Sequence, residues 1–94
     1  MEIRVLGAHC LESYDTRHTC FLIDGVLAVD AGSLASALTG EEQRRVLAVL
    51  LTHLHFDHIR DLPTVGLATL SEPKPIDLYS LLETRESVKR HILN

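Results

Sequence analysis

The segment from residue 53 to residue 58 contains three imidazoles and one carboxylate, carried by His53, His55, Asp57 and His58. In an extended chain, side chains two positions apart point the same way, so His53 and His55 can present two nitrogens to one metal ion. Where the chain turns into a helix, Asp57 and His58 can supply an oxygen and a nitrogen to a second ion. Two ions roughly 3.5–4 Å apart can share a hydroxide and clamp an ester oxygen. The segment therefore predicts a hydrolytic metal site.

The other histidines lack a second ligand at metal-binding spacing. A single histidine is more often packed or solvated than ligating, so we expect His9, His18 and His91 not to bind metal. His9 and His18 flank a loop that could fold over a site. Asp30 could form a turn or accept a hydrogen bond from a ligand histidine, and we favour the second role.

The pattern of apolar residues predicts strands that place this segment. A hairpin is expected around Asp24-Gly25, a pair that readily adopts the positive φ angles of a tight turn. Val46 to Leu51 is wholly apolar, which predicts a strand buried on both faces and ending at the histidine segment. The expected strands are 3–7, 19–24, 26–30, 46–51 and 76–79, the last entered through the stiff run Pro73-Lys74-Pro75.

Short helices are expected between the strands. Gly40 suits the end of a helical piece over 34–38, and a second helix begins at Glu41. Asp57 is a good N-cap for a turn or two over 57–62, which Pro63 discourages from continuing, whereas 64–71 is ambiguous. A capping box at Ser80-x-x-Glu83 begins a helix that runs to the end of the chain, with Leu81, Arg85, Val88 and Ile92 close to one face.

Composition indicates one small folded domain over residues 1–94. The chain is 46% hydrophobic and 23% charged, the composition of an ordinary globular protein. A net charge of −4 without a dense basic cluster argues against a nucleic-acid partner. The start has no signal peptide and no apolar run is long enough to span a bilayer, so we expect a cytoplasmic protein without membrane contact. Cys10 and Cys20 lack Cys-x-x-Cys spacing and are expected to be free thiols.

Two motifs resemble those of a known family. His53-x-His55-x-Asp57-His58 matches the His-x-His-x-Asp-His motif of the metallo-β-lactamase superfamily, and Val-Asp-Ala-Gly at 29–32 resembles its strand-end Asp-Ala-Gly. Residues 54–63 and the tail 87–94 look like the subgroup related to class II cyclic-nucleotide phosphodiesterases. The resemblance implies an α/β (α+β) fold, half of the family's αβ/βα sandwich, with a mixed, mostly antiparallel sheet and flanking helices.

The resemblance also implies roles for the site residues. His53 and His55 would bind the first metal, Asp57 and His58 the second, and the catalytic Asp57 would help orient the bridging hydroxide. Zinc is the family's usual ion, two per complete site, and iron or manganese occur in relatives.

The family completes its site with a further His, a bridging Asp and a last His downstream. In this chain Asp61, Asp77 and His91 are poor substitutes for them, so we expect the binuclear site to be incomplete and the domain to be truncated. The second sheet would also be missing. An uncovered apolar face predicts either a homo-oligomer or a partner that supplies the C-terminal half.

The leading hypothesis is the N-terminal half of a metal-dependent hydrolase that acts on a small-molecule phosphodiester, such as a cyclic nucleotide. The alternative is a non-catalytic metal-binding or interaction module, distinguished by one tightly held ion without turnover. A third hypothesis is a ribonuclease of the same superfamily. The acidic net charge argues against it, and so does Phe56, where such nucleases commonly carry a small residue. His53→Ala or His55→Ala should remove the first metal, and Asp57→Ala should disturb the second.

Overall fold

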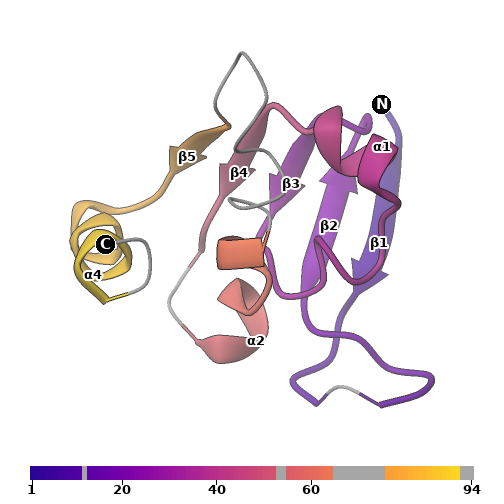
Figure 1. Cartoon of the computed structure of the whole chain (residues 1–94), viewed down its shortest axis with the longest axis horizontal. Helices are drawn as coiled ribbons and strands as arrows, with labels where there is room; N and C mark the ends of the chain where they lie inside the picture. The colour runs from indigo at the N-terminus through magenta and orange to yellow at the C-terminus, as the bar shows by residue number, and fades with distance from the viewer. Residues whose placement is uncertain (12, 53–54, 65–75, 92–94) are drawn as a thin grey trace.

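The computed structural model describes residues 1–11, 13–52, 55–64 and 76–91, with the side chain of residue 91 left out. Its five-stranded sheet has the order β1-β2-β3-β4-β5 (Figure 1). The strands are β1 (Ile3–Gly7), β2 (Cys20–Ile23), β3 (Leu27–Val29), β4 (Ala48–Leu50) and β5 (Asp77–Tyr79). The helices are α1 (Gly40–Arg44), α2 (Phe56–Ile59) and α4 (Leu82–His91). The α/β class predicted from the sequence is confirmed.

The sheet is mixed, as predicted, but its pairings are not mostly antiparallel. β1 pairs with β2 and β2 with β3 in antiparallel fashion, whereas β3 with β4 and β4 with β5 are parallel. The predicted hairpin joins β2 and β3, and Asp24 and Gly25 have the expected positive φ angles of 52° and 74°. Because β3, β4 and β5 are parallel, their carboxyl ends lie at one edge of the sheet. Ligand sites of open α/β sheets commonly lie at such an edge.

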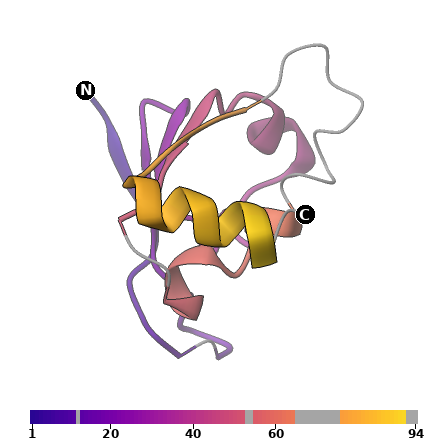
Figure 2. The same cartoon turned by 90° about the vertical axis from the view of Figure 1, so that its left-hand side faces the viewer.

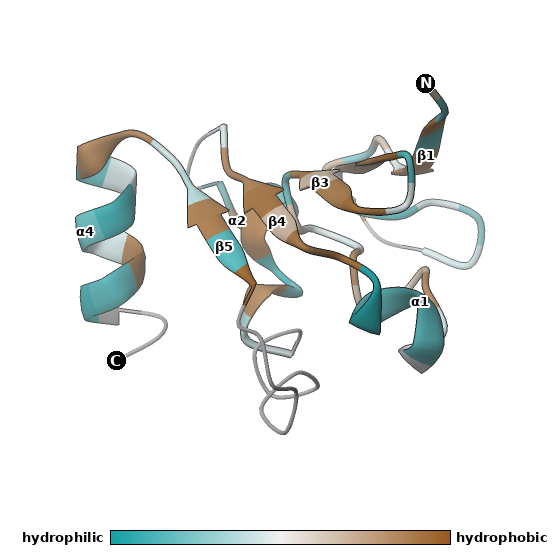
Figure 3. Ribbon diagram, turned by 90° about the horizontal axis from the view of Figure 1, so that it is seen from above, coloured by the Kyte–Doolittle hydropathy of each residue, from teal (hydrophilic) through white to brown (hydrophobic). Residues whose placement is uncertain are grey.

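One face of the sheet is buried and the other is largely open. The buried face carries Leu22, Ala28 and Val49, which join a core that also contains Leu34, Leu38 and Val88. In Figure 3, α1 lies beneath the sheet and α4 beyond β5. Figure 2 shows that α4 runs across the molecule on the β5 side. This one-sided core explains why Leu50, on the other face, is 40% exposed. The prediction that 46–51 is buried on both faces is therefore wrong for the described chain.

The region before β4 differs from the sequence prediction. Residues 34–38 form turns rather than a helix. The amides of Ala35 and Ser36 donate to the Asp61 carboxylate at 2.9 and 2.8 Å, so a residue from a distant part of the chain holds these turns. Gly40 is not a helix stop but the first residue of α1, one position before the predicted start. Thr39 and Glu42 form a capping box there.

The later helices are present with different ends. The N-cap of α2 is His55, not Asp57, because the chain is still extended at His55 (φ −65°, ψ 143°). Helical backbone resumes at 62–64, so Pro63 does not end helical structure; proline is compatible with a first helical turn. Ser80 makes no capping box, because its hydroxyl donates to the Leu81 carbonyl at 3.1 Å and α4 starts at Leu82.

Only part of the predicted α4 face is buried. Val88 is 1% exposed, but Leu81 is 69% exposed and precedes the helix. Ile92, the ambiguous region after residue 64 and the Pro73-Lys74-Pro75 entry lie outside the described residues. No helix of the described chain has the length and apolar character needed to cross a membrane. Both cysteines are free thiols, as predicted.

Candidate metal centre

The predicted site lies where β3 and β4 end side by side. Asp30 follows β3, and the segment that contains Asp57 and His58 follows β4. Figure 1 shows α2 just beyond these strand ends. His53 lies outside the described residues, so the first metal's predicted pair cannot be placed as a pair. His55 is exposed at the N-cap of α2, where its carbonyl accepts from the His58 amide at 2.9 Å.

Asp30 is buried, 2% exposed, and has a φ of 65°. Aspartate is among the few residues other than glycine that tolerate this left-handed region, and such conformations cluster at functional sites. One carboxylate oxygen accepts from the Thr52 amide at 2.8 Å. The other lies 2.7 Å from His58 Nδ1 and 2.8 Å from the Thr52 hydroxyl. Asp30 therefore joins the ends of β3 and β4, and it is the histidine acceptor that the sequence suggested.

The contact with Asp30 fixes how His58 presents its ring. An ionised carboxylate can only accept, so Nδ1 carries a proton and donates to Asp30. The remaining nitrogen, Nε2, lies 3.3 Å from Asp57 Oδ2. Nε2 must then either carry a second proton or face the carboxylate with its lone pair. The second arrangement is that of two ligands of one cation.

The Asp57 and His58 pair fits a metal ion as part of a ligand set. Both side chains are half-buried, 18% and 17% exposed, and imidazole nitrogen with carboxylate oxygen is the donor chemistry of zinc and related ions. Within the described ranges, no three His, Cys, Asp or Glu side chains gather closely enough to hold an ion. A complete set needs a further ligand beyond this pair.

The other titratable candidates have structural roles. His18 is buried, and its ring packs edge-on against that of Phe56 with 5.7 Å between the ring centroids. The backbone of His18 pairs with that of His9 through an isolated β-bridge. Asp61 caps the turns at Ala35 and Ser36. His91 ends α4, and Asp77 begins β5. Among the described side chains, neither His18 nor Asp61 nor Asp77 joins Asp57 and His58 in a cluster.

The environment of the buried thiol confirms that it is inert. Burial, together with the nearby Asp30 and Asp61 carboxylates, raises the pKa of Cys20 to about 12. A thiol with this pKa holds its proton at neutral pH and is neither a nucleophile nor a thiolate ligand. The site chemistry therefore rests on imidazole and carboxylate groups.

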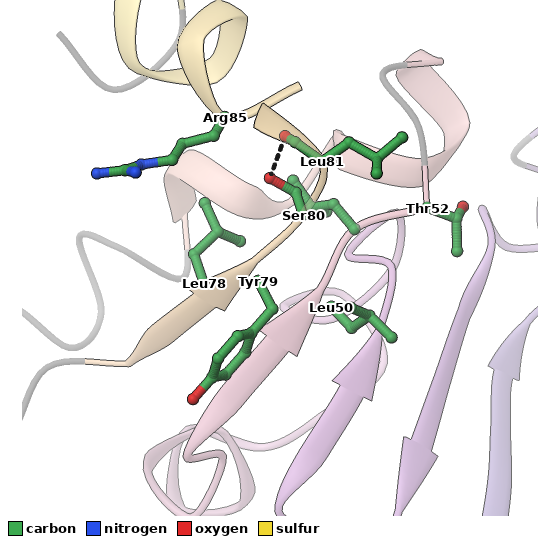
Figure 4. Close-up of a pocket in the computed structure, with 8 residues that line it drawn as sticks. Leu50, Thr52, Leu78, Tyr79, Ser80, Leu81 and Arg85 are labelled. Carbon is green, nitrogen blue, oxygen red and sulfur yellow. Dashed lines mark hydrogen bonds between the residues drawn. The ribbon is translucent and has the colours of Figure 1, made fainter. Parts of the chain in front are cut away.

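A groove of about 720 Å³ lies beside the site at the carboxyl ends of β4 and β5. Figure 4 shows Thr52 on one side of it and Arg85, from α4, on the opposite side. Leu50, Leu78 and Tyr79 form much of its apolar lining. Among the described residues, the Arg85 guanidinium has no ion pair. The groove therefore combines an apolar lining with the positive charge of Arg85, next to the predicted site.

Sequence reasoning missed Thr52 and the backbone contacts of Gly32. Thr52 directly precedes the histidine segment and binds Asp30 through both its amide and its hydroxyl. Its place at the strand end was a signal that could have been used. The Gly32 amide donates to the Thr19 carbonyl at 2.9 Å. No local sequence pattern reveals this contact, because it joins two separate segments of the chain.

Comparison with known proteins agrees with this architecture. Residues 14–69, more than half of the chain, match the profile of the Metallo-beta-lactamase superfamily. The fold is similar to the crystal structure of the metallo-beta-lactamase fold protein YhfI from Bacillus subtilis, with a TM-score of 0.73 and 23% sequence identity. The match covers 93% of this chain but only 40% of that one. No curated relative matches the chain. The chain belongs to the metallo-beta-lactamase superfamily.

Proposed function

We propose that this chain contributes metal ligands to a hydrolase that cleaves phosphodiester bonds. The observation that carries the proposal is the Asp57 and His58 pair, with Nε2 of His58 turned to Asp57 while Nδ1 is held by Asp30. His53 and His55 would bind one ion, and Asp57 and His58 a second. Zinc is the expected ion, and iron or manganese suit the same donors.

A bound ion supplies Lewis acidity and lowers the pKa of water, so no Ser or Cys nucleophile is required. The chain's own residues provide the arrangement. Asp57 accepts a proton or hydrogen bond from the attacking water and orients it. Asp30 bonds Nδ1 of His58 so that Nε2 is turned towards Asp57, and Thr52 fixes Asp30.

The choice of a phosphodiester substrate rests on the neighbouring groove. Arg85 contributes a permanent positive charge, and a guanidinium pairs well with phosphate oxygens. The apolar lining at Leu50 and Tyr79 suits a nucleoside or another apolar group attached to the phosphate. A cyclic nucleotide meets both requirements.

The direct test is hydrolysis of bis(p-nitrophenyl) phosphate by the zinc-loaded chain, beside p-nitrophenyl acetate as a neutral ester. We expect turnover of the phosphodiester that is lost in Asp57→Ala and reduced in Arg85→Ala. Arg90→Ala, on the same helix but outside the groove, is the matched control and should keep the wild-type rate. Hydrolysis of the neutral ester alone would contradict the choice of substrate.

One observation favours a second candidate, a non-catalytic metal-binding module. In the described part of the chain, no three candidate ligands gather closely enough to hold an ion. A single bound ion without hydrolysis of either ester would support this alternative over the hydrolase. Two ions with turnover would exclude it.

A further inference from the structure

Three chain segments meet at Gly32 with almost no space between them. The Thr19 amide donates to the Asp57 carbonyl at 2.9 Å, and the Gly32 amide donates to the Thr19 carbonyl, also at 2.9 Å. A β-carbon on residue 32 would overlap the Asp57 carbonyl oxygen and lie 2.7 Å from the β-carbon of His18. The Asp57 carbonyl therefore occupies the space that any other side chain would need.

The contact at Gly32 is one of a series of contacts between residues 30–32 and the segment that contains Asp57 and His58. Asp30 bonds the ring of His58, and the Ala31 amide donates to the His58 carbonyl at 2.6 Å. Gly32 admits the Asp57 carbonyl and anchors Thr19, which bonds that carbonyl. Three successive residues after β3 thus hold the two successive candidate ligands after β4.

The overlap at Gly32 involves backbone, not the end of a flexible side chain. A backbone carbonyl at the first turn of α2 can move only if the turn moves with it. Because α2 is four residues long and makes no side-chain cap bond at its N-cap, its own hydrogen bonds give it little resistance to displacement. The position of Asp57 is set by these outside contacts.

We propose that Gly32 is a positioning residue for Asp57, which fixes the place of the second-metal ligand by admitting its carbonyl to the Thr19 amide. The inference rests on the proposed function, since it gives Asp57 a metal to hold. The inference predicts that only one of the two metal sites is weakened. A side chain at residue 32 displaces Asp57 and lowers the affinity of the Asp57 and His58 site, while binding by His53 and His55 is retained.

The test compares Gly32→Ala with Gly40→Ala in the full 94-residue chain. Gly40 begins α1, and a β-carbon there meets nothing closer than the Arg44 guanidinium at 3.6 Å, so this control adds the same methyl without a clash. Zinc is titrated while NMR follows the ring signals of the individual histidines. We expect Gly32→Ala to bind zinc at His58 about 10- to 100-fold more weakly, with the His53 and His55 titration and the Gly40→Ala chain unchanged.

Equal affinity at His58 in Gly32→Ala and wild type would overturn the inference and leave the proposed function standing. Equal weakening at all three histidines would also overturn it, because it would show a general structural defect. Absence of any zinc response in the wild-type histidines would overturn the proposed function itself, and the inference with it.

A second variant covers the case in which Gly32→Ala does not fold. Replacing the amide at Thr19 by an ester removes one hydrogen-bond donor and adds no bulk, and Cys20 gives a ligation point for assembling the chain. The ester chain should lose affinity at His58 selectively. An unchanged affinity in a folded ester chain would contradict the inference.

Discussion

Asp30 and His58 show how a single buried residue can determine the chemistry of its neighbour. Asp30 accepts from the amide and hydroxyl of Thr52 and from the ring of His58. Because Nδ1 of His58 bonds Asp30, it is Nε2 that is turned towards Asp57. The tautomer of His58 is thus set by a residue 28 positions away in sequence.

Asp30→Asn should weaken metal binding at His58 without disturbing the fold. The Asn oxygen can still accept from Thr52, but its amide group then faces Nδ1 of His58 and favours the tautomer with the proton on Nε2. The expected loss of zinc affinity is about 10- to 100-fold, measured by competition with a chromophoric chelator.

Asp24→Asn is the matched control, because Asp24 also has a positive φ and lies in the hairpin away from the site. Its zinc affinity should equal that of the wild type. A similar loss in both variants would contradict the tautomer argument.

Individual residues were predicted unevenly from the sequence. The acceptor role of Asp30 could be predicted because Asp at a strand end before Ala-Gly suits either a turn or a ligand partner. The capping role of Asp61 could not, because it joins residues 35–36 to residue 61 across the fold. The placement of His53 stays a prediction.

At the scale of elements, the turns after β3 depend on Asp61. Its carboxylate is 5% exposed and accepts the amides of Ala35 and Ser36. Asp61→Ala should lower the free energy of unfolding by about 1–3 kcal/mol for each amide left without an acceptor. Urea denaturation of this variant beside Asp77→Ala, whose side chain is exposed on β5, measures the difference. Equal stability of the two variants would contradict the capping role.

The capping box of α1 predicts a dependence of stability on pH. The Thr39 amide and the Arg4 guanidinium bond the Glu42 carboxylate and lower its pKa from 4.5 to about 2. Because this folded pKa lies below the unfolded one, the stabilisation is complete above about pH 4.5 and is lost as the pH falls towards about 2.

Glu42→Gln should therefore reduce the change in urea midpoint between pH 5 and pH 2, a range that spans both values. Glu86→Gln, at an exposed position on α4, is the control and should follow the wild-type curve. The same change in urea midpoint in all three chains would show that the Glu42 cap does not contribute to the pH dependence of stability.

Elements were predictable where local pattern decides them. The strands and the hairpin follow from apolar runs and from Asp24-Gly25, and α1 follows from its cap. The segment 34–38 forms turns instead of the expected helix, and the carboxylate that holds these turns comes from a distant part of the chain. The buried strand at 46–51 was misjudged because an apolar sequence shows what a strand could bury, not whether a second layer covers it.

At the scale of the whole molecule, the main feature is the open sheet face. Register places Val5, Phe21, Val29, Leu50 and Tyr79 in one row across all five strands. Val5 is 60% exposed and Tyr79 56%. Apolar patches of this kind mark interaction surfaces.

We propose that a second copy of the chain covers this face when the 94 residues are alone in solution. Light scattering should give a mass above that of one chain, and Val5→Lys should shift it towards the monomer. Leu11→Lys, at a 76% exposed position in the loop before β2, is the control and should leave the mass unchanged. A monomeric wild type would contradict self-association.

The most direct test of the central claim is the metal content of the purified chain, measured by elemental analysis. We predict that the chain binds zinc and that Asp57→Ala/His58→Ala loses one ion per chain. His9→Ala/Asp15→Ala removes the same residue types from the loop before β2 and should keep the wild-type content. Equal metal content in the two double variants, or no metal in a folded wild-type chain, would contradict the assignment of Asp57 and His58 as metal ligands.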